Sequence, residues 1–527
     1  MGSGLHAYGG RPYAVLPSGE VAVVDAETGQ VVVGKATTGT AHTYGDLASS
    51  GSRLLCVRED ADGDELVTVD PATGSSTVLR TTDGFFSSPD TRGERLAWTS
   101  WDRDVMPWDS SQIWVADYVP GGPVGVPVLV AGGPAESAVQ PRWADDGSLF
   151  FLSDRSGWWN LYQWRSGRIE AVAPMPAECA AAPWESGYAN YVLLPGNRIG
   201  ITVQHGPEHQ LVVMEPGGGT SPLALPYTSI KPYLAAVGDR IALIGASPTR
   251  PQEIALVATD GSDHLAVVRG DPIDGGDGVS VPQVLRVASA GVELTVLFYP
   301  PTAEPAPLIV RPHSGPTHHS DLRLDWEVQF FTSRGFAVAD VDYRGSTGYG
   351  RDFRKALDGN WGRFDVEDCR NVAEHLLATG RALPQAVFIS GASAGGYTAL
   401  RAACEDGPFT MAVARSAIVD PNRWKTTAPR FQRPHAAILA HDHAAVTPGQ
   451  VRRPVLLIHG DRDDVAPVND ATTLADALER RHLLVGMLRL DGVGHYLSAP
   501  AALAAALEAE LDAYQAVLRQ AGLRLPD

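Results

Sequence analysis

The chain has 527 residues, and its 61 acidic against 42 basic side chains give a formal net charge of −19 at pH 7. This length exceeds what one hydrophobic core normally supports, so it predicts two or more domains. The acidic balance argues against nucleic acid and anionic membrane surfaces as partners, because both would be repelled. The first residues show neither the basic region nor the apolar stretch of a signal peptide, so we expect a cytoplasmic protein.

Cysteine and histidine spacing bears on disulfides and metals. The four cysteines are spread along the chain without a C-x-x-C pair: Cys56, Cys179, Cys369 and Cys404. This pattern predicts free, buried thiols in a reducing compartment. The stretch His441–His443 offers metal-ligand types, as does His205 with Glu208 and His209, but neither group has further ligands at a familiar spacing. We therefore expect polar loop residues there, and neither a metal nor another cofactor.

Residues 1–270 consist of short β-rich runs closed by turn residues. Val21–Asp25 and Leu66–Asp70 are examples, each followed by a Thr-Gly turn. Comparable runs begin near residues 12, 53, 96, 149, 198 and 240, a spacing typical of four-stranded propeller blades. We predict a β-propeller of six or seven blades, complete or incomplete, and keep a pair of β-sandwiches as the alternative.

The pattern changes after residues 271–283, a stretch of Gly, Asp and Pro that predicts a linker. From 284 to 527, apolar runs such as Leu308–Val310 and Pro454–His459 alternate with helical stretches such as Gly395–Glu405. Strands that are apolar throughout and separated by helices indicate a mostly parallel sheet covered on both faces. We predict a doubly wound α/β-hydrolase domain.

A candidate nucleophile, Ser393, lies between a predicted strand and a predicted helix. Gly391 and Gly395 flank it in the pattern G-x-S-x-G. A serine at a sharp strand-to-helix turn needs small neighbours, and the following helix supplies backbone N–H groups where an oxyanion forms. A packing turn is the alternative reading of the motif, and the strand before it and the helix after it argue against that reading.

The partners of the nucleophile are expected later in the chain, in the order acid and then histidine. A buried strand ends at Gly460 and is followed by three aspartates, of which we choose Asp463 as the acid. Asp461 and Asp464 are interpreted as turn-forming or solvated residues. His495, in a Gly-rich loop, is the candidate base, because a serine hydroxyl is a poor nucleophile until a base removes its proton.

A second oxyanion donor is expected in the loop after an earlier strand, where Gly315 offers a closely approaching backbone N–H beside that of Ala394. His313 in the same loop either contacts substrate or only fills space, and both readings stay open. Val465, Tyr397 and Trp108 are further candidates for substrate contact. For Trp108 and the other paired tryptophans, packing in the propeller core is the stronger reading.

Several segments together resemble the prolyl oligopeptidase family of serine peptidases, most closely its acylaminoacyl-peptidase and dipeptidyl-aminopeptidase-like branch. They are His313–Thr317, Thr332–Gly350, Trp361–Asp368, Gly391–Tyr397 and the loops of Asp463 and His495. The resemblance implies a propeller of typically seven blades over a hydrolase that cleaves short peptides or acyl-peptides. It matches Ser393, Asp463 and His495 to the triad, and the backbone of Ala394 and Gly315 to the oxyanion site.

The sequence departs from the family pattern at three places. Ser314 stands where the family usually has glycine, and Val465 stands where peptide-cleaving relatives often carry Arg or Asn. The stretch between Asp420 and Arg453 is short and unusual. These departures make the chemistry easier to predict than the substrate.

The predicted function is hydrolysis of an amide or ester in a short peptide or acyl-peptide through an acyl-Ser393 intermediate. One alternative is a specialised acyl hydrolase or acyltransferase that acts on a non-peptide ester or modified amino acid. Another is a binding protein whose propeller recognises a ligand while the hydrolase fold is an inactive scaffold. The sequence leaves a monomer and a homo-oligomer both open.

Overall fold

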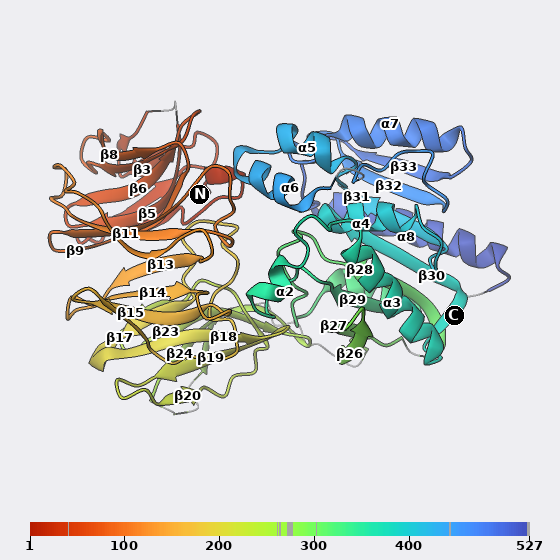
Figure 1. The fold of residues 1–527 in the computed structure, drawn as a ribbon, viewed down its shortest axis with the longest axis horizontal. Helices are drawn as coiled ribbons and strands as arrows, with labels where there is room; N and C mark the ends of the chain where they lie inside the picture. The colour runs from red at the N-terminus through yellow and green to blue at the C-terminus, as the bar shows by residue number, and fades with distance from the viewer. Residues whose placement is uncertain are drawn as a thin grey trace.

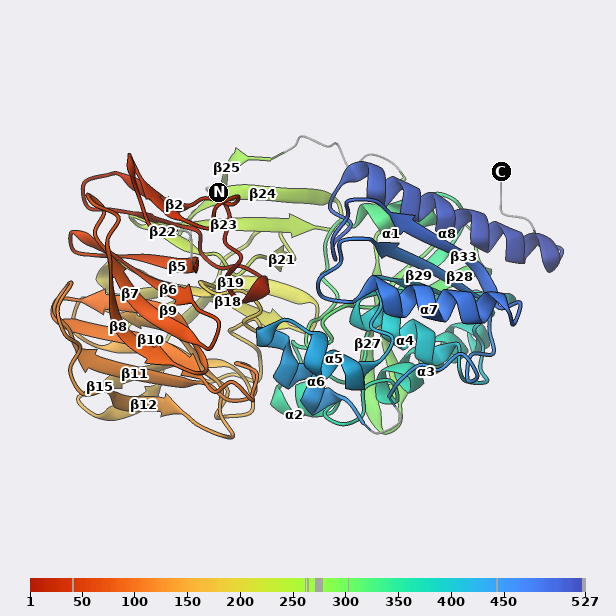
Figure 2. The same ribbon diagram turned by 90° about the horizontal axis from the view of Figure 1, so that it is seen from above.

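The computed structural model describes residues 1–39, 42–260, 262, 265–270, 278–301, 303–441 and 444–523. Its ribbon has two parts side by side (Figure 1): sheets coloured red to yellow-green, and an α/β part coloured green to blue. The view from above shows the same division (Figure 2). Residues 271–277 of the predicted linker lie outside the described residues, so the predicted domain boundaries stay a prediction.

The N-terminal part is a β-propeller of six antiparallel sheets, which we call blades 1 to 6. Blades 1 to 3 contain β1 (Tyr13–Val15), β2 (Val21–Val24), β3 (Val31–Val33), β4 (Ala36–Thr37); β5 (Thr43–Ser50), β6 (Arg53–Glu59), β7 (Asp64–Val69), β8 (Ser76–Thr82); and β9 (Phe85–Arg92), β10 (Arg95–Trp101), β11 (Gln112–Asp117), β12 (Val128–Gly132). Blades 4 to 6 contain β13 (Ala138–Trp143), β14 (Leu149–Ser153), β15 (Asn160–Arg165), β16 (Arg168–Ala171); β17 (Tyr191–Leu194), β18 (Arg198–His205), β19 (Glu208–Met214), β20 (Thr220–Pro222); and β21 (Ser229–Ile230), β22 (Ala235–Val237), β23 (Arg240–Ser247), β24 (Arg250–Ala258), β25 (Leu265–Arg269).

Successive blades pack through apolar side chains that alternate along each strand. On β3, Val31 and Val33 are buried and belong to a core shared with Leu54 of blade 2. A four-stranded sheet cannot enclose a core alone, so each blade buries its apolar faces against its neighbours. The described residues form six blades, so the six units of the sequence are confirmed, and the seven typical of the family are not found here.

The C-terminal part is built on one eight-stranded sheet in the order β26-β27-β29-β28-β30-β31-β32-β33. Its strands are β26 (Gln283–Ser289), β27 (Val292–Tyr299), β28 (Ala306–Pro312), β29 (Ala337–Asp342), β30 (Ala382–Ala392), β31 (Met411–Arg415), β32 (Val455–Gly460) and β33 (Leu484–Leu490). The pairs from β29 to β33 are parallel, and β26 and β27 join antiparallel. The predicted mostly parallel sheet is therefore confirmed.

Helices cover both faces of this sheet. They are α1 (Trp326–Thr332), α2 (Arg351–Lys355), α3 (Phe364–Ala378), α4 (Ala394–Ala402), α5 (Pro421–Thr427), α6 (Arg433–Leu439), α7 (Val468–Glu479) and α8 (Pro500–Gln520). One core joins the sheet to α3, α4 and α7, and the other joins it to α1 and α8. Leu457 packs into the first core and its neighbour Ile458 into the second, which explains why the strand is apolar throughout.

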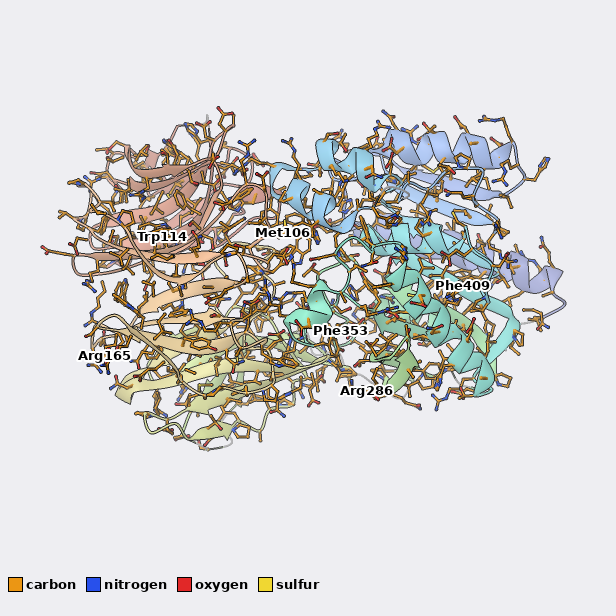
Figure 3. All side chains as sticks on the ribbon, viewed as in Figure 1. Met106, Trp114, Arg165, Arg286, Phe353 and Phe409 are labelled. Atoms are coloured by element: carbon orange, nitrogen blue, oxygen red, sulfur yellow. The ribbon has the colours of Figure 1, made fainter. Side chains whose placement is uncertain are left out.

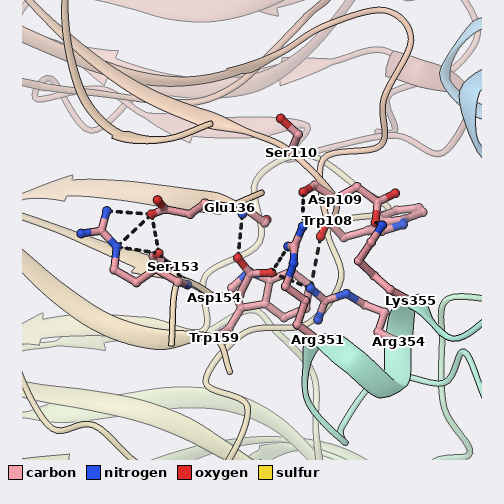
Figure 4. Close-up of polar contacts among 12 residues, drawn as sticks. Trp108, Asp109, Ser110, Glu136, Ser153, Asp154, Trp159, Arg351, Arg354 and Lys355 are labelled. Carbon is pink, nitrogen blue, oxygen red and sulfur yellow. Dashed lines mark hydrogen bonds and ion pairs between the residues drawn. The ribbon is translucent and has the colours of Figure 1, made fainter. Parts of the chain in front are cut away.

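Helix α2 of the hydrolase part contacts the propeller; Figure 3 labels its Phe353 and, in the propeller, Met106. Arg354 and Arg351 both pair with the buried carboxylate of Asp154, the former at 2.6 Å (Figure 4). Lys355 lies 3.2 Å from Asp109 at the same contact. These cationic groups hold α2 against blades 3 and 4.

A second contact comes from the short 3-10 helix Arg430–Gln432, inside the stretch that the sequence marked as unusual. The Phe431 ring is buried in a propeller core, 5.8 Å from the rings of both His6 and Phe85. Arg430 pairs with Glu59 at 3.1 Å and lies over the Phe85 ring. The propeller thus supplies an aromatic socket for a side chain of the other part.

Within the described ranges, no helix combines the length and the apolar character that a membrane crossing requires.

Candidate active site

Ser393 occupies the sharp turn between β30 and α4. Its backbone has φ 53° and ψ −116°, a conformation that non-glycine residues rarely adopt. A Cβ on Gly391 would lie 2.4 Å from the carbonyl of Gly395, and a Cβ on Gly395 would lie 2.2 Å from the carbonyl oxygen of Pro312. Both flanking positions therefore require glycine, as the sequence motif predicted.

His495 lies in the loop after β33 and contacts both Ser393 and Asp463. Its Nε2 is 3.0 Å from Ser393 Oγ, and its Nδ1 is 2.9 Å and 3.0 Å from the two carboxylate oxygens of Asp463. Because a carboxylate only accepts, the neutral imidazole carries its hydrogen on Nδ1 and leaves Nε2 to accept from the hydroxyl. The structure therefore brings the three predicted residues into one hydrogen-bonded chain.

The Asp463 carboxylate is buried and held by several donors. Burial alone would raise its pKa, but hydrogen bonds from His459 and His495 and from the backbone outweigh burial and hold the pKa well below its usual range. The backbone N–H groups of Val465 and Ala466 donate to it at 3.0 Å and 2.8 Å. The carboxylate therefore stays ionised opposite the imidazole.

The two competing aspartates have other surroundings. Asp461 accepts from the N–H of Gly492 at 2.7 Å, which ties the acid loop to the histidine loop, and Asp464 is exposed. Gly460 lies so close to the histidine loop that a Cβ would come within 2.3 Å of the Val493 carbonyl oxygen. These contacts fix the position of the loop that carries His495.

The predicted oxyanion donors lie on the two segments beside Ser393. Gly315 lines the cavity and has φ 122°, a region that favours glycine. The neighbouring Ser314 hydroxyl donates to the Ala392 carbonyl at 3.0 Å, which packs this loop against the nucleophile turn. Ala394 is the first residue of α4, where backbone N–H groups lack partners within the helix. The arrangement is compatible with two N–H donors, and their role stays a prediction.

His313 is engaged within its own loop. Its Nδ1 lies 2.8 Å from the Ser314 carbonyl oxygen and its Nε2 lies 2.7 Å from the Ser346 hydroxyl. The Tyr343 ring stacks on it at 4.2 Å, and burial lowers its pKa to about 3. This neutral imidazole braces the loop of Gly315, and no substrate contact follows from the geometry.

The other three predicted contact residues also have structural partners and are absent from the residues that line the cavity. The Tyr397 hydroxyl donates to the Ala444 carbonyl at 2.7 Å, and Val465 is buried in the core of the α/β part. Trp108 packs against Trp184 at 4.6 Å between their rings. Their contact with a substrate therefore stays a prediction without structural support.

Ser393 opens into a cavity of about 330 Å³ whose walls come from both parts of the chain. The hydrolase part supplies Gly315, Ser393, His495 and Tyr496, among others. The propeller supplies side chains such as Glu185, Tyr188, Lys231 and Tyr233. A cavity of this size, with walls from both parts, suits a short, partly polar substrate.

Glu185 and Lys231 are charged wall residues that the sequence reasoning missed. The Tyr233 hydroxyl donates to Glu185 at 2.6 Å, and no cation pairs with Glu185 in the part of the chain that the structure describes. Lys231 likewise has no ion pair within those residues. Glu185 lies in an irregular segment between blades 4 and 5, and no local motif distinguishes it.

The histidines weighed as metal ligands are placed as follows. His209 lines the cavity, and its Nδ1 accepts from the N–H of Ile230 at 2.9 Å. Residues 442–443 of the other group lie outside the described residues. Across the ranges that are described, no group of three or more His, Cys, Asp or Glu side chains is arranged to hold a metal ion.

This fold and this site define a class of protein: an α/β-hydrolase joined to a β-propeller, with a serine, a histidine and an aspartate in one hydrogen-bonded chain. Residues 322–520 match the sequence model described as the prolyl oligopeptidase family. This match lies within the α/β part of the chain and includes Ser393, Asp463 and His495.

Two sequence relatives each match less than half of this chain. The acylamino-acid-releasing enzyme of Rattus norvegicus is 28% identical over 236 residues, which cover 41% of this chain and 31% of the relative. The uncharacterized peptidase YuxL of Bacillus subtilis is 23% identical over 277 residues, which cover 48% and 41% respectively. The matched region thus spans less than half of the length of these relatives.

Solved structures match almost the whole chain. A puromycin-hydrolyzing peptidase of Mycobacterium tuberculosis has a TM-score of 0.91 at 28% identity, covering 99% of this chain and 88% of its own. A puromycin hydrolase complexed with PGG has a TM-score of 0.91 at 26% identity, covering 100% and 90%. The combination of propeller and hydrolase is therefore shared with these enzymes.

Proposed function

We propose that the protein is a serine peptidase that cleaves an amide bond in short peptide-like substrates through an acyl-Ser393 intermediate. The observation that carries this proposal is the unbroken hydrogen-bonded chain from Ser393 through His495 to Asp463, at the wall of a cavity that the propeller also lines. An inactive binding scaffold would not need these three groups in reacting geometry.

In the proposed mechanism, His495 Nε2 takes the proton of Ser393 Oγ while Oγ attacks the substrate carbonyl. The oxyanion that forms accepts from the backbone N–H groups of Gly315 and Ala394. The imidazolium, stabilised by Asp463, then gives its proton to the leaving amine, and the C–N bond breaks to leave the acyl-serine. A water molecule repeats the sequence: His495 takes its proton, the hydroxyl attacks the ester, and Ser393 regains its hydrogen as the acid leaves.

The wall charges favour a substrate with a free amino group. An unpaired carboxylate in a confined cavity, as at Glu185, gains from a cation and is costly to leave without one. The names of the relatives point to two substrate kinds, since some are acylamino-acid-releasing enzymes and others puromycin hydrolases. We therefore propose a free α-amino group beside Glu185 and keep N-acylated peptides as the second candidate.

Two experiments test the proposal. A fluorophosphonate probe should label the wild type and leave Ser393→Ala unlabelled, whereas an inactive scaffold would not be labelled at all. Hydrolysis rates on alanyl-nitroanilide, its N-acetyl form, a nitrophenyl ester and puromycin then separate the substrate classes.

The free amine should be preferred, and Glu185→Gln should reduce that preference by about tenfold or more, the loss expected when one charge-assisted contact is removed. Preference for the acetylated substrate would support the acyl-peptide candidate. Activity on the ester alone would support the specialised acyl hydrolase.

We also propose a cytoplasmic location. All four cysteines are free and buried, a usage typical of a reducing compartment. Cell fractionation with an antibody to the native protein tests this location, and recovery in a secreted fraction would contradict it.

A further inference from the structure

A second histidine touches the carboxylate of Asp463. His459, the residue before the end of β32, is buried, and its Nε2 lies 3.2 Å from Asp463 Oδ2. The same nitrogen lies 2.8 Å from the carbonyl oxygen of Ala466. His459 has no place in the proton transfers described above, so its contact with the acid calls for a separate explanation.

The contact with Ala466 fixes the role of His459. A carbonyl oxygen only accepts, so His459 Nε2 must carry a hydrogen, which it shares between this oxygen and Asp463 Oδ2. The N–H of Ala466 in turn donates to Asp463 Oδ1 at 2.8 Å. His459 therefore donates to Oδ2 and the Ala466 N–H donates to Oδ1, while His495 Nδ1 lies within 3.0 Å of both oxygens.

The two oxygens are not equally provided with donors. Oδ1 accepts from the backbone N–H groups of Val465 and Ala466 as well as from His495. For Oδ2, His459 is the one donor besides His495 that the described residues supply. Loss of His459 would leave the oxygen closest to His495 with more negative charge and would free the carboxylate to rotate.

We propose that His459 is a positioning residue for the reaction. It keeps the Asp463 carboxylate directed at His495 Nδ1 and draws negative charge from Oδ2, which limits how strongly the carboxylate stabilises the imidazolium that forms during the reaction. This inference rests on the proposed function, because it assigns His459 to the base that activates Ser393.

Other titratable groups surround this pair and would be unchanged in a His459 variant. Asp464 and Tyr496 lie in the same loops, Tyr8 approaches from the N-terminal segment, and Asp470 comes from α7. Glu185 faces Tyr496 from the propeller. His459 also interacts electrostatically with Asp470, and every neutral variant of His459 changes that interaction alike, so the comparison between variants isolates the contact with Asp463.

The experiment measures kcat/KM against pH for His459→Leu, His459→Asn and His459→Gln on an amide substrate that the wild type cleaves. Without the donor, the pKa of His495 should rise, so the acid limb of the Leu profile should move up by about 0.5–1 pH unit, the range set by one hydrogen bond. The shorter Asn amide cannot span to Asp463 and should behave like Leu. The longer Gln amide can donate to both Asp463 Oδ2 and the Ala466 carbonyl, so it should return the acid limb to its wild-type position.

A matched control is His6→Leu, because His6 is also buried and its Nε2 lies 2.7 Å from a buried aspartate oxygen, that of Asp64 in the propeller. It should lower the melting temperature without moving the acid limb. An unmoved limb in all active His459 variants, or an equal shift in Gln and Leu, would overturn the proposal. An unlabelled, inactive wild type would refute the proposed function instead, so the two failures are distinguishable.

Discussion

Substitution of Asp154 by alanine should weaken the contact between the two parts more than any surface change. The side chain of Asp154 is buried, its Oδ2 contacts Arg351 and Arg354, and its Oδ1 accepts from the N–H of Ser137 at 2.7 Å. The Arg354 side chain is only 1% exposed, and its Nε and Nη1 have no hydrogen-bond partner among the residues that the structure describes. Its positive charge therefore depends on Asp154, with Glu178 next at 3.7 Å.

The magnitude follows from this burial. Removing one partner of a buried ion pair leaves an uncompensated charge and costs about 3–5 kcal/mol. Domains are stable by only about 5–15 kcal/mol in total, so the loss is a large share. The cation above the Trp159 ring at 3.9 Å offsets a small part of it.

Urea unfolding followed by tryptophan fluorescence measures the effect, with Asp145→Ala as the matched control. Asp145 pairs with Arg92 at 3.3 Å, but its side chain is fully exposed, so we expect no measurable change there. Asp154→Asn, which keeps an acceptor for Ser137, should fall between the two. If Asp154→Ala shifts the midpoint no more than Asp145→Ala does, water reaches the arginines and the reasoning from burial is wrong.

Further outcomes follow from the site and from the sheet beneath it. Asp463→Asn should lower kcat on the order of 10³-fold or more and Asp464→Asn only mildly, and the reverse order in steady-state assays would overturn the choice of acid. Gly395→Ala should abolish fluorophosphonate labelling, because its Cβ would meet the Pro312 carbonyl at 2.2 Å; normal labelling would show that the turn can widen. Burial raises the pKa of Asp342 to about 7, so the stability that its neutral form contributes is complete below about pH 4 and is lost as pH rises through 7. Asp342→Asn should remove that slope from a plot of melting temperature against pH, and identical slopes would contradict the shift. A tripeptide amide should be cleaved far faster than casein, and efficient internal cleavage of casein would argue against an enclosed cavity.

Local spacing was enough to predict the features that depend on neighbouring residues. The turn at Ser393 needs glycine two residues away on each side, and this requirement is visible in the sequence as the motif G-x-S-x-G. The alternation of Leu457 and Ile458 between two cores likewise appears as an unbroken apolar run. The repeat of the propeller could be counted because each blade spans a similar length of chain.

Features that depend on distant segments could not be predicted in this way. Glu185 and Tyr233 reach the cavity from different propeller segments, and nothing adjacent to either residue signals the other. Tyr397 was predicted as a candidate for substrate contact, yet its place one helical turn after Ser393 directs its ring onto Trp361 at 4.4 Å. Local sequence patterns therefore predicted the catalytic residues better than they predicted the residues that line the cavity.

The socket for Phe431 also constrains how the chain is made. The propeller strands end at Arg269, so a ribosome completes the socket residues long before it reaches Phe431. N-terminal domains generally fold first during synthesis, which makes the propeller a preformed receptor for the emerging half. If the hydrolase half were expressed alone, Phe431 and the charge of Arg430 would lack their partners. Phe431 would then add to an exposed hydrophobic patch that promotes aggregation. The order of the two halves along the chain therefore favours folding of the propeller before the hydrolase half docks onto it.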